Sequence, residues 1–128
     1  MQKERSVPRI VVTGMGALAA NGNDTQTFWE NLVAGKTGID KITRFDTTDI
    51  TSKVGGELKG FDPTKYMDPK DAKRNDRYVQ LAVAAAHMAY ADAGLKVGEV
   101  DPDRLGVIIG SGIGGIASIE EQSFALFE

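Results

Sequence analysis

The amino-acid sequence predicts an α/β fold with a mostly parallel sheet. Two runs of β-branched apolar residues, at 9–13 and 105–109, have the continuous apolar character of strands covered on both faces. Helical patterns between and after them give the order strand, helix, helix, strand, helix, which is typical of α/β proteins. Residues 81–89 form a helical pattern that is apolar on nearly every side. Two strands cannot cover such a helix and be covered themselves, so we expect the chain to be part of a larger domain.

The composition is that of one ordinary globular domain. Of the 128 residues, 41% are hydrophobic and 26% are charged, which excludes a disordered chain. The net charge of -3 offers no general attraction for nucleic acid or anionic lipid. No unbroken apolar stretch reaches the roughly 18 residues of a membrane helix. We therefore expect neither a nucleic-acid partner nor a membrane.

The N-terminus has two interpretations. Lys3, Arg5 and Arg9 precede an apolar stretch, as in a secretory signal peptide. Gly14 and Gly16 interrupt the helix that such a peptide would need. The sequence therefore favours a cytoplasmic protein over a secreted one.

The residues most often used in nucleophilic catalysis are almost absent. The chain has no cysteine, and its single histidine, His87, lies within the apolar half of a helical pattern. We expect His87 to be a core or interface histidine. Asp40 and Asp92 have no acid–base partner in the sequence, and no metal-ligand spacing occurs. Most of the chemistry of any enzyme containing this chain must then lie elsewhere.

The first predicted strand ends at a glycine cluster, Gly14-x-Gly16-x-x-Ala19. The cluster satisfies a relaxed dinucleotide-binding pattern. However, the turn at residues 21–23 separates it from the next helix, and no acidic residue follows at the required distance. A tight turn after a buried strand is the better interpretation.

A helix is expected after this turn. Asp24 or Thr25 can cap its N-terminus, and Gly35 stands where a left-handed C-terminal cap is expected. Residues 36–69 are less regular, with a short edge strand expected at 53–58.

One long helix is predicted from about residue 71 to residue 93, ending at Gly94. Its start is basic and its spacing places the cations on one face, where they oppose the helix dipole. This face is either solvated or a docking site for an acidic partner. The cations are Lys70, Lys73, Arg74 and Arg77.

The second predicted strand ends at a stricter glycine pattern, Gly110-x-Gly112-x-x-Gly115, and a further helix begins near Ile116. Backbone N–H groups of such a run can bind phosphate. Alternatively, the run is a flexible, close-packed strand exit. Both interpretations stay open from the pattern alone.

Taken in order, several segments resemble one family. They are residues 9–16, Asn21-Gly22 with the Phe28-Trp29 helix ending at Gly35, residues 37–39 and 44–46, residues 73–77 and residues 110–115. The ordered set resembles the beta-ketoacyl-acyl carrier protein synthases of the elongating type II class. No single motif is decisive, but the resemblance spans essentially the whole chain.

The resemblance implies a thiolase-like, layered αβαβα fold, usually in a homodimer. Residues 1–128 would be the incomplete N-terminal portion of the synthase N-terminal domain. Such enzymes extend fatty acyl chains by decarboxylative condensation with malonyl-acyl carrier protein, using a cysteine and two histidines. These catalytic residues are expected beyond Glu128, so the fragment alone is expected to be inactive. Some cysteine-less relatives act as chain-length partners, and whether the parent chain keeps its cysteine stays open.

Two sites are implied by position in the family. Ile113, between Gly112 and Gly114, matches the side chain that gates the acyl pocket. A basic patch matches the surface that docks acyl carrier protein. Phosphopantetheine arrives on that carrier, so no cofactor or metal of the synthase itself is expected. The patch consists of Lys70, Lys73 and Arg74.

Two other classes of function are compatible with the sequence. One is a small nucleotide-binding module that uses residues 110–115. The other is a non-catalytic interaction domain that recognises acidic partners through the basic helix.

Overall fold

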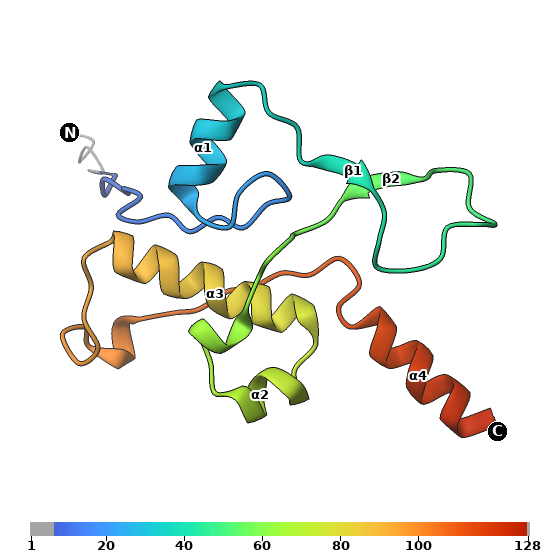
Figure 1. The fold of residues 1–128 in the computed structure, drawn as a ribbon. Helices are drawn as coiled ribbons and strands as arrows, with labels where there is room; N and C mark the ends of the chain where they lie inside the picture. The colour runs from blue at the N-terminus through green and yellow to red at the C-terminus, as the bar shows by residue number, and fades with distance from the viewer. Residues whose placement is uncertain (1–6, 128) are drawn as a thin grey trace, which may run out of the picture.

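The computed structural model describes residues 7–127. Their α-helices are α1 (Thr25–Val33), α2 (Pro69–Arg74), α3 (Arg77–Asp92) and α4 (Ile116–Phe127), with strands β1 (Ile39–Lys41) and β2 (Val54–Gly56) (Figure 1). Two short 3₁₀ helices, η1 (Pro63–Lys65) and η2 (Pro102–Arg104), complete the regular elements. Lys3 and Arg5, which suggested the signal peptide, lie outside the described residues.

The first helix forms as predicted. Asp24 Oδ1 accepts a hydrogen bond from the Thr27 backbone N–H at 2.8 Å, which satisfies one unpaired donor of the first turn. Gly35, just after the helix, has φ of 67°. Glycine adopts this left-handed conformation without steric cost, so the chain turns away here.

The predicted single helix over residues 71–93 is wrong in one respect, because it is divided into α2 and α3. Asn75 is extended, with φ of -102° and ψ of 137°. Its side chain donates to Asp71 O at 2.9 Å, and Gln80 Nε2 donates to Ala72 O at 2.7 Å. These bonds to carbonyl groups stabilise the break. The predicted end is confirmed, since Gly94 also has φ of 67°.

The predicted strands at 9–13 and 105–109 are not formed within this chain. The described residues contain one sheet, the antiparallel pair β1–β2, with Ile39 opposite Gly56. The expected edge strand at 53–58 is thus confirmed in shorter form, while the mostly parallel sheet is not. Figure 1 shows both apolar runs as extended segments without a neighbouring strand. Ile10 and Ile108 are 90% and 100% exposed, so these runs lack the partners that a ladder requires.

Almost nothing in the described residues is fully buried. Ala72 and Ala84 are the only buried hydrophobic residues among them. The expectation of a core around the apolar half of α3 is therefore not met by this chain alone. His87 is exposed, and its ring is tilted against Tyr66 at 6.3 Å between centroids, so it is not in a core of this chain, and the interface role stays a prediction. No helix in residues 7–127 is long and apolar enough to cross a membrane.

The first glycine cluster packs directly on α3. A Cβ atom at Gly14 would overlap the carbonyl oxygen of Ala89, and one at Gly16 would overlap that of Ala85. Nearby, Met15 N–H donates to Asp92 Oδ2 at 2.8 Å. Close approach to the helix backbone therefore explains these glycines without any ligand.

Candidate functional site

The second glycine run lies between an extended segment and α4, and it carries an exposed apolar side chain. Ile113 is 72% exposed. A Cβ atom at Gly112 would meet nothing within 4 Å, and Gly114 has φ of 79°. Ser111 Oγ accepts from Gly114 N–H at 3.0 Å. The run thus presents Ile113 on backbone that few neighbours restrain.

The end of this run is held by the start of α3. A Cβ atom at Gly114 would lie 3.7 Å from Tyr78 Cε1. A Cβ atom at Gly115 would overlap the Asp76 carboxylate, which also accepts a hydrogen bond from Ser118 Oγ. The glycine run is therefore fixed at Gly115 and open at Gly112.

An open cleft of about 700 Å³ adjoins the run. Its walls come from residues 44–45, β2 and Leu58, the start of α3, and the start of α4. Phe45, Tyr78, Leu81 and Ile116 supply most of its large apolar lining. Charged residues also line it, so the cleft combines an apolar wall, which can accept an apolar chain, with polar groups at its sides. They are Arg44, Glu57, Asp76, Arg77 and Glu120.

The patch of Lys70, Lys73 and Arg74 lies on α2, and all three residues are exposed. None of the ion pairs in the described part of the chain involves them. Because α2 ends at Arg74, two of these cations occupy its last turn. There they favour the helix dipole, which corrects the expectation that they oppose it.

Arg77 does not share this basic face, contrary to the helical spacing. The break at Asn75 moves it onto α3, where its guanidinium donates to Leu58 O at 3.1 Å and lies over the Phe61 ring. Burial, and secondly the positive charge of Arg44, lowers the pKa of Arg77. Arg77 thus holds the cleft wall at Leu58, and only the three residues of α2 form the basic face.

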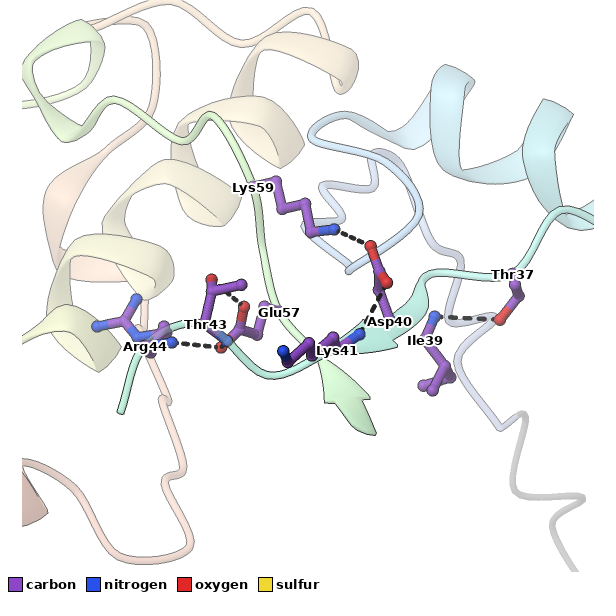
Figure 2. A network of polar contacts seen from close by, with 8 residues as sticks. All are labelled: Thr37, Ile39, Asp40, Lys41, Thr43, Arg44, Glu57 and Lys59. Carbon is purple, nitrogen blue, oxygen red and sulfur yellow. Dashed lines mark hydrogen bonds and ion pairs between the residues drawn. The ribbon is translucent and has the colours of Figure 1, made fainter. Parts of the chain in front are cut away.

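A polar network holds the strand pair beside the cleft, and the sequence pattern gave no sign of it (Figure 2). Glu57 accepts hydrogen bonds from Thr43 Oγ1 at 2.8 Å and from the backbone N–H groups of Thr43 and Arg44. Asp40 forms an ion pair with Lys59. Asp40 therefore has a structural partner rather than a catalytic one.

These contacts predict a dependence of stability on pH. The hydrogen bond from the Thr43 side chain is the main cause that lowers the pKa of Glu57 below its ordinary value of 4.5. A lowered folded-state pKa contributes stability above the unfolded value, and that stability is lost as pH falls through the folded value. We expect Glu57→Gln to lower urea resistance at pH 7, with the difference from the wild type shrinking as pH falls well below 4.5.

The control for this experiment is Glu99→Gln, which removes only an exposed pair with Lys96 at 3.6 Å. It should change urea resistance little at either pH. Equal effects of the two substitutions at pH 7 would contradict the assignment of a structural role to Glu57.

The described residues contain no catalytic constellation. Residues 7–127 hold no group of three His, Cys, Asp or Glu residues that could bind a metal. The chain has no cysteine, and the ring contact of His87 is with Tyr66. The described residues therefore offer no thiol or imidazole nucleophile paired with a base.

Comparisons with known proteins agree with this picture. Residues 8–126 match the family model described as beta-ketoacyl synthase, N-terminal domain. The 3-oxoacyl-[acyl-carrier-protein] synthase 2 of Synechocystis is 46% identical over 120 residues, covering 94% of this chain and 29% of that protein. The synthase of the same name from Staphylococcus aureus is 51% identical over 112 residues, covering 88% and 27%. The chain thus spans less than a third of the length of these relatives.

Two solved structures share the fold. The ishigamide ketosynthase/chain length factor superposes with a TM-score of 0.69 at 32% identity, over 92% of this chain and 30% of that one. A type II PKS acyl-carrier protein in complex with its ketosynthase, bound to the hexaketide, gives a TM-score of 0.71 at 27% identity. That match covers 91% of this chain and 31% of the other. The general fold is therefore that of ketosynthases.

Proposed function

Because this chain belongs to the beta-ketoacyl synthase family, we propose that it is the incomplete N-terminal portion of an elongating beta-ketoacyl-acyl carrier protein synthase. The full-length protein would be a cytoplasmic acyltransferase of fatty acid biosynthesis that condenses acyl groups with malonyl-acyl carrier protein. This chain has no cysteine, so the nucleophile and its histidine pair would lie on the rest of the synthase. The substrate would arrive on the carrier's phosphopantetheine, and these 128 residues alone would be inactive.

The observation that carries the proposal is the glycine run, whose end at Gly114 and Gly115 lines the cleft. Ile113 is branched, apolar and exposed, and Gly112 and Gly114 flank it. A side chain that opens and closes a pocket needs backbone that can change conformation at low cost, which glycine provides. Ile113 would therefore be the gate of the acyl pocket, with Gly112 and Gly114 as the parts that move.

The basic patch on α2 would dock the carrier. Three exposed cations lie within five residues of a short helix and have no ion-pair partner in residues 7–127. Opposite charges on two surfaces accelerate encounter and make it sensitive to salt. The second similar structure is an acyl-carrier protein in complex with its ketosynthase, which supports a carrier as the partner here.

The rest of the synthase would complete the layered αβαβα fold. The runs at 9–13 and 105–109 have the composition of buried strands but are exposed. Strands from the remaining chain would pair with them and form the mostly parallel sheet. A homodimer is the assembly that the family resemblance implies.

Nucleotide binding by residues 110–115 is less well supported. A phosphate bound at the start of α4 would have to lie near Gly115, where the carboxylate of Asp76 is in contact. Two negative groups at this place would repel each other. A non-catalytic interaction domain would use the same basic patch. Only the absence of turnover by the full-length protein would distinguish it from a synthase.

The docking proposal predicts a specific kinetic defect. In the full-length synthase, Lys73→Glu with Arg74→Glu should raise KM for acyl-carrier protein about tenfold, with little change in kcat, because association loses its electrostatic attraction. The measurement is steady-state kinetics with acyl-carrier protein at low and high ionic strength. The difference between variant and wild type should shrink at high salt.

A matched control is Lys36→Glu with Lys41→Glu, which changes the net charge equally at exposed lysines outside α2. This pair should leave KM nearly unchanged. If both double variants raise KM equally, only net charge matters and the patch on α2 is an ordinary solvated surface.

A further inference from the structure

Aspartates occupy the N-cap position of five helices, and one of them behaves differently. Asp24, Asp62, Asp68 and Asp101 each accept a hydrogen bond from a backbone N–H of their own helix. Asp76 is the N-cap residue of α3, yet within the described residues its side chain makes no such bond. An aspartate at this position ordinarily stabilises its own helix. The missing cap bond therefore raises the question of which other group the Asp76 carboxylate contacts.

The carboxylate of Asp76 is turned toward the glycine run and α4. Asp76 Oδ1 accepts a hydrogen bond from Ser118 Oγ, although 42 residues separate them in sequence. The carboxylate also lies against Gly115, where any side chain would overlap it. Glycine at position 115 is therefore required for this contact, and the contact joins the start of α3 to the end of the glycine run.

This contact gives the run one fixed end. Cβ atoms placed at Gly110 and Gly112 would meet nothing within 4 Å, whereas Gly115 is held by Asp76. Within the described residues the contacts of the run are therefore concentrated at Gly114 and Gly115, so this end is the point about which the run can turn. The position of Ile113 then depends on where Asp76 and Ser118 place that end.

We propose that Asp76 is a positioning residue that fixes the pivot of the Ile113 gate through Ser118 and Gly115, and thereby sets acyl-length selectivity. The proposal rests on the proposed function of Ile113. Long acyl chains need the gate open, and short ones do not. Releasing the pivot lowers the cost of opening, so it favours long chains relative to short ones.

The experiment uses the full-length synthase with hexanoyl- and tetradecanoyl-acyl carrier protein as substrates. Asp76→Ala and Ser118→Ala should each raise the ratio of kcat/KM for the long chain over that for the short chain about tenfold. This factor corresponds to the free energy that a hydrogen bond to a charged group contributes. The double variant should show no larger change than either single variant, because both substitutions remove one contact. Asp76→Asn, whose side-chain oxygen can still accept from Ser118, should keep most of the wild-type ratio.

Asp24→Ala is the matched control, because it removes the aspartate N-cap of α1, a helix that Figure 1 shows apart from α4. It should leave the ratio unchanged even where it lowers stability. If Asp76→Ala fails to fold, Ser118→Ala and Asp76→Asn still give the two contrasting results.

Ile113→Phe separates failure of this inference from failure of the gate. An effect of Ile113→Phe on chain length, together with an unchanged ratio in Asp76→Ala and Ser118→Ala, would overturn the inference alone. Additive effects of the two alanine substitutions would also overturn it, since independent residues add. No effect of Ile113→Phe would refute the gate, and the positioning role of Asp76 with it.

Discussion

Substitution of Ile113 by phenylalanine is expected to block long acyl chains while sparing short ones in the full-length synthase. Ile113 is exposed in the glycine run, directly before the two glycines that line the cleft. A phenyl ring is larger and stiffer, so it should occupy the space that a long chain enters when the gate opens. We expect kcat/KM for a tetradecanoyl substrate to fall about a hundredfold, with hexanoyl transfer changed about twofold at most.

The measurement is kcat/KM for acyl-carrier substrates of increasing chain length. Ile119→Phe is the control, since Ile119 is 62% exposed on α4, outside the glycine run. It should leave the chain-length profile intact. If Ile113→Phe leaves the dependence of kcat/KM on chain length unchanged, Ile113 is not the gate.

Gly16→Ala is expected to destabilise the full-length synthase by about 3 kcal/mol, which is large for a single methyl group. The new Cβ would overlap the carbonyl oxygen of Ala85 and lie 2.8 Å from Met88 Cβ and 2.9 Å from Ala89 N. Two of these atoms belong to the backbone of α3, so no side-chain rotation can relieve the overlap. The N-terminal segment must move away from the helix, which breaks its packing.

The measurement is the free energy of unfolding from urea titration, followed by helical circular dichroism. The control is the same substitution at Gly56, where a Cβ would meet Ala20 Cβ at 3.4 Å and Ile39 Cδ1 at 3.5 Å. These are ordinary contacts, so Gly56→Ala should change stability by about 0.5 kcal/mol or less. Equal effects at the two positions would show that residue 16 does not pack closely on α3.

The sequence predicted the local features of the fold well. The cap at Asp24 and the left-handed turns at Gly35 and Gly94 follow from interactions within a few residues. The start of α4 at Ile116 followed from the glycine run that precedes it. The break at Asn75 was missed because no glycine or proline marks it in the sequence. Side-chain hydrogen bonds from Asn75 and Gln80 to carbonyl groups of α2 stabilise the end of that helix.

The candidate site was predicted in part. The residues of the gate and of the docking patch were proposed from the ordered motifs, and their roles stay predictions. The spacing wrongly placed Arg77 with the patch, because one extended residue, Asn75, redirects the chain. The contact of Asp76 with Ser118 could not be predicted, since nothing in the local sequence distinguishes this N-cap aspartate from the others.

The sequence by itself thus determined the caps of α1, the end of α3 and the start of α4, and which family the chain resembles. Only the tertiary structure decided that the runs at 9–13 and 105–109 stay unpaired in this chain, and that Asp76 serves the glycine run rather than its own helix. The physical reason is the range of the interactions. Caps and turns are completed by neighbours in sequence, whereas a strand or a long-range carboxylate contact exists only where the fold brings its partner close.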